Sequence, residues 1–125
     1  NHFDEKHREL CDHIKERADE EHLFNGFWYG QAQKWLNMTL KYVRLLGLWK
    51  NEFGDLSSIM HVPVDSYIIK AAKDELKISS SPKPKPWSEW THTEYKQFQE
   101  DLQSAIKDRD PIDWENEAWI KQAAK

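Results

Sequence analysis

The N-terminal segment carries carboxylate, histidine and cysteine side chains at spacings that bring them together on one helix face. Asp4 and His7, and again Asp19 and His22, stand three residues apart. Carboxylate–histidine pairs bind metal ions when facing helices of a bundle each contribute one pair. Here both pairs fall on one predicted helix, and His7 with Cys11 is an incomplete ligand set. We therefore expect no metal site, no cofactor, and a solvated charged face.

A second group of polar side chains interrupts the most apolar segment, residues 28–46. Its members are Gln31, Gln33, Lys34 and Asn37. One interpretation is a polar patch that faces a cleft or a partner, with Gln31 and Asn37 as binding residues. The other is a solvent-facing stripe together with a buried amide whose hydrogen bonds are satisfied inside the fold. The sequence leaves both interpretations open.

Tryptophan is the most unusual feature of the composition, with 7 in 125 residues. Aromatic side chains dominate cores, but they also dominate interfaces and stacking sites. We expect most of them in the core. The candidates for binding are Trp28, Tyr29, Trp35, Trp87 and Trp90. The last two either form a docking element for a partner or anchor the neighbouring linker to the domain.

Two short pieces are the most specific stretches of the chain: residues 30–34 (Gly-Gln-Ala-Gln-Lys) and residues 61–68 (His-Val-Pro-Val-Asp-Ser-Tyr-Ile). The second resembles the segment of helix-hairpin-helix DNA glycosylases in which a Pro-Val-Asp enters a helix. The resemblance implies nucleic-acid processing. It also implies Asp65 as the carboxylate that supports cleavage of the base–sugar bond, and Lys34 as the nucleophile.

The residue types suit the chemistry that this resemblance implies. A carboxylate at a helix N-terminus is stabilised by the helix dipole. A fixed negative charge there stabilises an oxocarbenium-like sugar in the transition state. A desolvated lysine amine can form a Schiff base, and neighbouring aromatic rings can hold an extruded base. The alternative is that Asp65 only caps a helix and that Lys34 is an ordinary polar residue.

Apolar residues at helical spacing predict the elements that position these groups. A helix over residues 2–22 carries one narrow apolar stripe. The helix over residues 28–46 is apolar nearly all round, which is typical of a helix at the centre of a core, and it stops at Gly47. A third helix begins behind Asp65. The stripe of the first helix consists of Phe3, Leu10, Ile14 and Ala18.

The C-terminal part follows a proline-rich segment, residues 79–86, which predicts an exposed linker. Thr91 with Glu94 matches a capping box, and Asp110 before a proline matches a helix start. Residues 87–125 thus predict two further helices, which are too short for a separate core.

Together these elements predict one all-α domain over residues 1–125, a compact bundle of five main helices. Residues 1–78 form a three-helix part, and the two C-terminal helices pack back onto it.

Composition and charge exclude several classes of protein. Hydrophobic residues make up 38% and charged residues 32% of the chain, which is typical of a soluble folded domain. No apolar run approaches the roughly 18 residues of a membrane helix, and residues 1–22 are too charged for a signal peptide. The net charge of −4 disfavours sequence-independent binding of nucleic acid. The single cysteine fits a reducing compartment, so we expect a cytoplasmic protein.

We therefore expect a small helical binding or interaction domain without a complete catalytic motif. Its partner is an unidentified protein or a small ligand. The alternative is a nucleic-acid-processing enzyme related to helix-hairpin-helix DNA glycosylases, and whether the chain is an enzyme stays open. Under that alternative, Lys34 and Asp65 should converge in one open, basic cleft.

Overall fold

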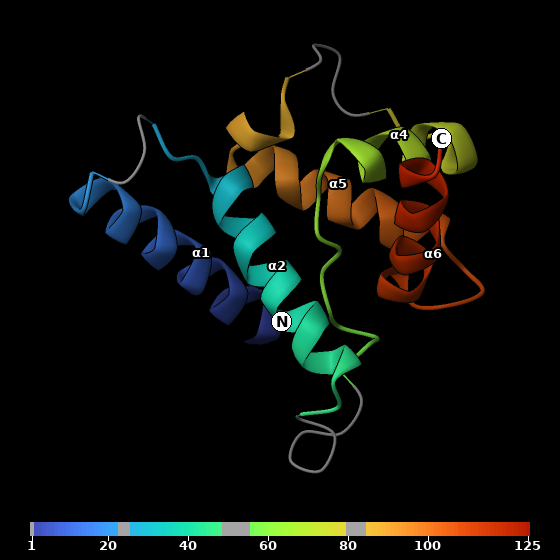
Figure 1. Cartoon of the computed structure of the whole chain (residues 1–125), viewed down its shortest axis with the longest axis horizontal. Helices are drawn as coiled ribbons and strands as arrows, with labels where there is room; N and C mark the ends of the chain where they lie inside the picture. The colour runs from blue at the N-terminus through green and yellow to red at the C-terminus, as the bar shows by residue number, and fades with distance from the viewer. Residues whose placement is uncertain (1, 23–25, 49–55, 80–84) are drawn as a thin grey trace.

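The structure, a computed structural model, describes residues 2–22, 26–48, 56–79 and 85–125. These residues form five α-helices and one short 3-10 helix, without a β-strand (Figure 1). The all-α prediction is confirmed, whereas most of the predicted proline-rich linker lies outside the described residues. The elements are α1 (His2–Glu20), α2 (Tyr29–Leu45), α4 (Ser66–Leu76), η1 (Trp87–Glu89), α5 (His92–Ala105) and α6 (Pro111–Ala123).

Two helix ends are built by the residues that the sequence indicated. The Asp65 carboxylate accepts a hydrogen bond from the backbone N–H of Ile68 at 2.9 Å and caps α4, which satisfies one of the amides left free at a helix start. Gly47 ends α2 with a φ of +70°, in the left-handed region where glycine is unstrained. Its N–H bonds back to the Arg44 carbonyl, as in a glycine-based helix stop.

The predicted starts of α5 and α6 are also correct, but the caps differ from the expected ones. Neither Thr91 nor Asp110 makes a side-chain hydrogen bond to the helix backbone. The Thr91 hydroxyl donates instead to the Glu94 carboxylate at 3.1 Å. Pro111 fills the first position of α6, where its fixed φ and missing N–H carry no penalty.

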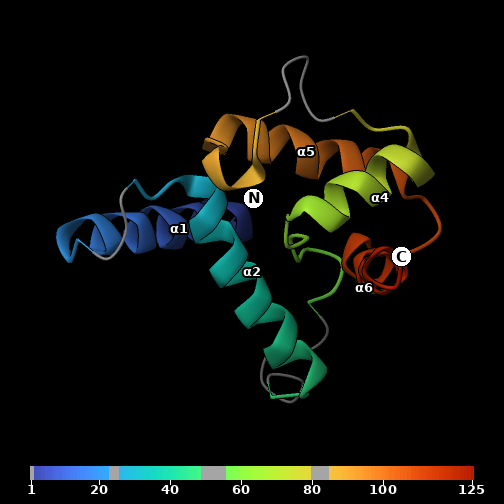
Figure 2. The same ribbon diagram turned by 45° about the horizontal axis from the view of Figure 1, so that its top comes forward.

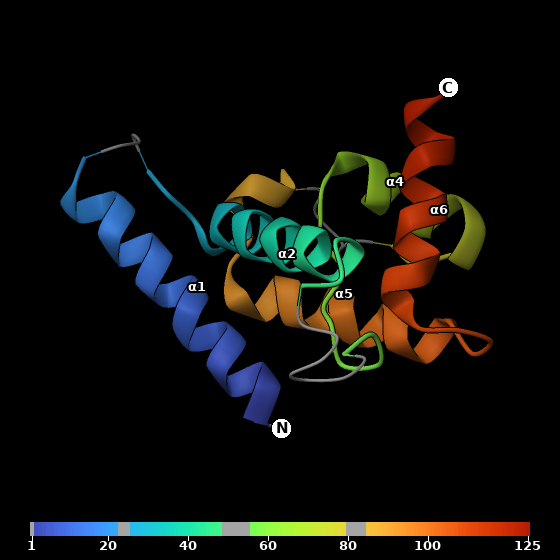
Figure 3. The same cartoon turned by 60° about the horizontal axis from the view of Figure 1, so that its bottom comes forward.

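The helices surround an extended segment, residues 60–65. α1 and α6 lie at opposite sides of the molecule, with α2 and α5 between them (Figures 1 and 3). α2 packs against α1 and η1, and α4 packs against α6. Buried apolar side chains from the five α-helices, from the extended segment and from Trp90 after η1 join one core cluster, which includes Cys11, Ala32, Val62, Ile68, Trp90, Phe98 and Trp114.

The predicted apolar stripe of α1 is only partly its buried face. Leu10 is 53% exposed. The buried residues of this helix are His7, Cys11 and Ala18, which recur at helical spacing on a neighbouring face. His7 is stable on this packed face because its ring has hydrogen-bond partners inside the fold, as described below.

The expectation that α2 is buried all round is wrong for its second half. Its buried residues, from Tyr29 to Asn37, lie in the first turns. Tyr42 and Leu45 are 55% and 54% exposed, because the C-terminal half of α2 extends away from α1 and α5 (Figure 2). Apolar character alone did not distinguish a core face from an exposed apolar face.

Candidate functional site

Two glutamine side chains hold the extended segment at the centre of the fold. From α2, Gln33 Nε2 donates to the Val64 carbonyl at 2.9 Å, and Gln33 Oε1 accepts from the Val64 N–H at 3.1 Å. From α5, Gln99 makes the same pair of bonds to Val62, at 2.7 and 3.0 Å. Each amide thus replaces a neighbouring β-strand, and the segment keeps its backbone hydrogen bonds without a sheet.

A chain of polar groups continues from this clamp towards α1. Asn37 Nδ2 donates to Gln33 Oε1 at 2.9 Å and to the Tyr95 hydroxyl at 3.0 Å. The Asn37 oxygen therefore accepts from Nε2 of His7, at 2.6 Å. The Tyr95 hydroxyl in turn donates to His61 Nδ1 at 2.5 Å. Every group of this chain is matched to a donor or an acceptor.

The chain ends at the surface on the first turn of α1. His61 Nδ1 is an acceptor, so the ring proton sits on Nε2, which donates to the Asp4 carboxylate at 2.6 Å. The imidazole is thereby fixed in one tautomer and one orientation. The contact also ties the start of α1 to the extended segment, 57 residues away in the sequence.

Burial keeps this network uncharged inside the molecule. Desolvation, reinforced by the nearby His61, lowers the pKa of His7 to about 4. Desolvation also lowers the pKa of His61, against the opposing hydrogen bond and charge of Asp4. For the Tyr95 hydroxyl, burial raises the pKa well above its usual range, and the hydrogen bond from Asn37 only partly opposes this. Both histidines and the tyrosine are thus neutral at pH 7.

Asp4, His61 and Tyr95 place a carboxylate, an imidazole and a hydroxyl in sequence, which is the order found in a nucleophilic triad. A nucleophile, however, must lose its proton and reach the substrate. Tyr95 is 1% exposed and its hydroxyl is engaged on both sides. The arrangement therefore positions the extended segment and α1, and it does not present an activated nucleophile.

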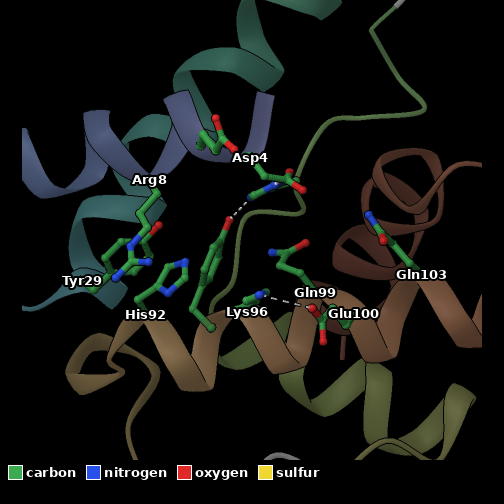
Figure 4. A pocket seen from close by; sticks show the side chains of 11 residues that line it. Asp4, Arg8, Tyr29, His92, Lys96, Gln99, Glu100 and Gln103 are labelled. Carbon is green, nitrogen blue, oxygen red and sulfur yellow. Dashed lines mark hydrogen bonds and ion pairs between the residues drawn. The ribbon is translucent and has the colours of Figure 1, made fainter. Parts of the chain in front are cut away.

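Beside this network lies a pocket of about 310 Å³ between α1 and α5 (Figure 4). Tyr29, His61 and Tyr95 form part of its wall. Charged side chains of both signs surround it. They are Asp4, Glu5 and Arg8 from α1 and Lys96 and Glu100 from α5.

The predicted catalytic pair is brought together from positions 31 residues apart. Lys34 Nζ lies 2.6 Å from Asp65 Oδ2. The same oxygen accepts a hydrogen bond from Trp119 Nε1 at 2.9 Å, while the other oxygen of Asp65 caps α4. The carboxylate is therefore fixed by three donors, and Asp65 joins the start of α4 to Lys34 of α2 and to Trp119 of α6.

Two further ion pairs extend this connection along α2. Lys41 Nζ lies 3.0 Å from Glu115 Oε2, and the two side chains are 11% and 1% exposed. Burial raises the pKa of Glu115, although Lys41 opposes the shift. Arg44 lies 2.9 Å from Asp113 nearer the surface. α2 and α6 are thus bridged by long cationic side chains.

The predicted binding residues divide into exposed and structural ones. Trp28 and Trp35 are 43% and 47% exposed. Tyr29 and Asn37 are buried, and Asn37 belongs to the polar network. Gln31 accepts from the backbone N–H of Trp28 at 3.0 Å and so completes the start of α2. The interpretation of a buried, satisfied amide therefore holds for Gln33 and Asn37.

Trp90 and Trp87 act as anchors in this structure. Trp90 is 2% exposed, and Trp87 packs against the core cluster. The carbonyl of Trp90 accepts from the Gly30 N–H at 2.9 Å. A Cβ at Gly30 would lie 1.9 Å from the Trp87 carbonyl oxygen. Glycine is therefore needed here because η1 approaches the start of α2 closely.

A second hollow, an apolar groove of about 410 Å³, lies between α1 and Trp35 of α2. Leu10, Ile14 and Ala18 line it from α1, and Trp35 lines it from α2. His13, Arg17 and Glu21 form its polar edge. Leu10, which seemed from its spacing to belong to the core, is thus part of an exposed apolar surface.

Three residues of this region were not recognised from the sequence as site residues: His61, Tyr95 and Gln99. The spacing of Tyr95 places it in the apolar stripe of its helix. Gln99 is not distinguished in the sequence from the other polar residues of α5. The only available signal was the unusual density of polar residues in the apolar segment around Gln33. Such a density indicates a buried network, but it does not identify the partners.

No family model, curated protein or solved structure matches the chain. Within the described ranges, no cluster of three or more His, Cys, Asp or Glu side chains could hold a metal ion. None of the helices described is long and apolar enough to cross a membrane.

Proposed function

We propose that the protein is a helical interaction domain that takes an amphipathic helix of a partner protein into the groove between α1 and Trp35. The observation that carries this proposal is the exposure of Leu10 and Trp35, at 53% and 47%, in one apolar groove. Large apolar side chains exposed together are typical of an interface. Tryptophan in particular contributes strongly to binding free energy.

The shape of the groove favours a helix as the bound element. Its α1 wall consists of residues 10, 13, 14, 17, 18 and 21, which follow the spacing of one helix face. A second helix lying along such a face would contribute apolar residues at the same spacing. Side chains that line the groove from α1 would then pack between those of the partner.

The charge of α1 favours a partner with basic residues beside its apolar stripe. The helix carries seven carboxylates against four lysine and arginine side chains. Its ion pairs, such as Arg17 with Glu21, are largely exposed, so they are weak and easily exchanged. A basic flank on the partner would gain attraction from this acidic helix and would bind faster at low salt.

Site-specific photo-crosslinking in cells tests the proposal. Benzoylphenylalanine would replace His13 at the groove edge and, in a control protein, Tyr42 on the exposed end of α2. Sequencing of the crosslinked segment should return an amphipathic helix with basic flanking residues. Absence of a crosslink specific to position 13 would contradict the proposal.

A synthetic peptide of that segment then allows a quantitative test. Trp35→Ala and Leu10→Glu should each weaken peptide binding at least about tenfold, whereas Tyr42→Ala should have little effect. Circular dichroism would show that each variant is folded. Unchanged affinity in both groove variants would also contradict the proposal.

The contact between Lys34 and Asp65 favours a second candidate, the nucleic-acid-processing enzyme related to helix-hairpin-helix glycosylases. That chemistry requires the two residues to converge in an open, basic cleft, and the 2.6 Å contact between them supports the convergence. Tyr67, which is 44% exposed, packs edge-to-face on Trp119 beside the pair. Such rings could stack on a base. The lysine amine would first have to leave its carboxylate partner.

Borohydride trapping with abasic and damaged DNA separates this candidate from the interaction domain. A covalent adduct that Lys34→Met abolishes and Lys70→Met leaves intact would support lysine chemistry. Lys70 is a suitable control because it is exposed on α4. Absence of both adduct and base release would exclude the enzyme for the lesions tested.

A further inference from the structure

The pocket between α1 and α5 is a separate site from the α1 groove, and its lining carries charges of both signs. Its volume of about 310 Å³ lies at the lower end of the range for small-molecule sites. A metabolite of about amino-acid size fits this range. The charges of the lining determine which charge such a ligand should carry.

One end of the pocket is cationic. Arg8, His92 and the ring of Tyr29 lie together there (Figure 4). Burial lowers the pKa of His92, and the charges of Arg8 and Lys96 lower it further while Asp12 opposes the shift, so the ring is neutral at pH 7 and Arg8 carries the positive charge of this end. A carboxylate placed between Arg8 and His92 would accept a charge-assisted hydrogen bond from Arg8 and a second hydrogen bond from the ring N–H of His92.

These cationic groups are available to a ligand. The ion pair of Arg8 with Asp12 is long, at 4.0 Å, and both side chains are more than half exposed. Lys96 is similarly loosely paired, at 3.8 Å from Glu100. His92 has a ring contact with Tyr29, but it makes no hydrogen bond within the part of the chain that the structure describes.

The rest of the lining carries three carboxylates, with the Lys96 ammonium group beside one of them, Glu100. The carboxylates are Asp4 and Glu5 on α1 and Glu100 on α5. Asp4 and Glu100 lie away from the end at which Arg8 meets His92 (Figure 4). Among the described residues, Glu5 has no ion-pair partner. These carboxylates would attract an ammonium group and repel a simple anion.

We infer that this pocket binds a small zwitterion of the amino-acid class, with its carboxylate at Arg8 and His92 and its ammonium group at the acidic side. An anion alone would meet three carboxylates, and a cation alone would meet the Arg8 end. A zwitterion in one orientation is attracted at both ends. The rings of Tyr29 and Tyr95 supply an apolar wall for its carbon skeleton.

Titration of the folded protein with single amino acids, followed by NMR of the histidine rings, tests this inference. At least one of the common amino acids should shift the His92 resonances saturably at millimolar concentration or below. His13, which lies in the α1 groove, should not respond, so the result is independent of the proposed interaction with a partner helix. Absence of a saturable shift with every amino acid would overturn the inference.

Two matched comparisons then test the assignment of the charges. For the amino acid that binds best, the analogue without the amino group and the analogue without the carboxylate should each bind at least about tenfold more weakly. Arg8→Gln should weaken binding by a similar factor, whereas Arg17→Gln, an equal charge change elsewhere on α1, should not. Equal binding of the deaminated analogue, or no effect of Arg8→Gln, would contradict the zwitterion assignment.

Discussion

The side-chain amide of Gln33 pairs with both backbone groups of Val64, 31 residues further along the chain. This contact explains why a glutamine with 0% exposure is stable in an otherwise apolar helix, since all its polar atoms are hydrogen-bonded. The same amide accepts from Asn37. One residue therefore links the extended segment to the polar chain that ends at α1.

Gln33→Leu should destabilise the protein by about 3 kcal/mol. The substitution keeps similar volume but leaves the buried N–H and C=O of Val64 without partners, at about 1–3 kcal/mol for each buried group. Urea denaturation would measure the change. Gln97→Leu on the exposed face of α5 is the control and should change stability by less than about 0.5 kcal/mol. A loss below about 1 kcal/mol for Gln33→Leu would show that the clamp is dispensable.

Stability should fall between pH 6.5 and pH 4 because of His7. Burial in the fold lowers the pKa of this imidazole from its ordinary value of 6.5 to about 4, so the unfolded chain takes up the proton first. The contribution of His7 to stability is complete above pH 6.5 and is lost as the pH falls through this window, amounting to about 3 kcal/mol.

Urea denaturation of the wild type and of His7→Gln at pH 7 and pH 4 isolates this contribution. The comparison is needed because carboxylates also titrate in this range. The wild type should lose more stability than the variant on acidification. Equal losses would mean that His7 is not held neutral by the fold.

Gly30→Ala should destabilise the protein by more than about 2 kcal/mol, although alanine normally favours a helix over glycine by about 1 kcal/mol. The steric effect dominates because the new Cβ would lie 1.9 Å from a backbone oxygen of Trp87. Thermal denaturation would measure it. Gly47→Ala, where the Cβ meets nothing within 4 Å, should cost only about 1 kcal/mol for its left-handed φ. A stabilising Gly30→Ala would rule out the close approach of η1.

Lys41→Met should destabilise the protein by about 3 kcal/mol, because Glu115 would remain buried without its cation. Adding Glu115→Leu should recover most of this loss, since the charge that needs compensation is then removed. A double-mutant cycle from urea denaturation curves gives the coupling free energy. Additive effects of the two substitutions would show that the buried pair is not coupled.

The sequence predicted the helices better than their packing faces. Apolar periodicity and helix-breaking residues located all five helices. As expected, α4 begins after Asp65 and α2 ends before Gly47. The buried position of His7 could not be predicted, because it depends on Asn37 from another helix. Nor could the exposure of Leu10, since the apolar spacing of a helix is the same for a core face and for a binding face.

The candidate sites were also predicted only in part. Lys34 and Asp65 were chosen from local motifs, and the fold brings them into contact. The pocket beside His61 was missed because it is assembled from α1, the extended segment and α5, and none of these carries a recognisable motif by itself. Long-range hydrogen bonds, such as that from Tyr95 to His61, leave no periodic signal in the sequence.

Amide hydrogen exchange of Val62 and Val64 tests most directly the claim that buried polar side chains organise this fold around residues 61–64. These amides lie in an extended segment without helix or sheet, yet each donates to a buried glutamine oxygen. They should therefore exchange only through global unfolding, with the same protection as core amides of α2 and α5. Exchange as fast as that of an exposed loop would contradict the account.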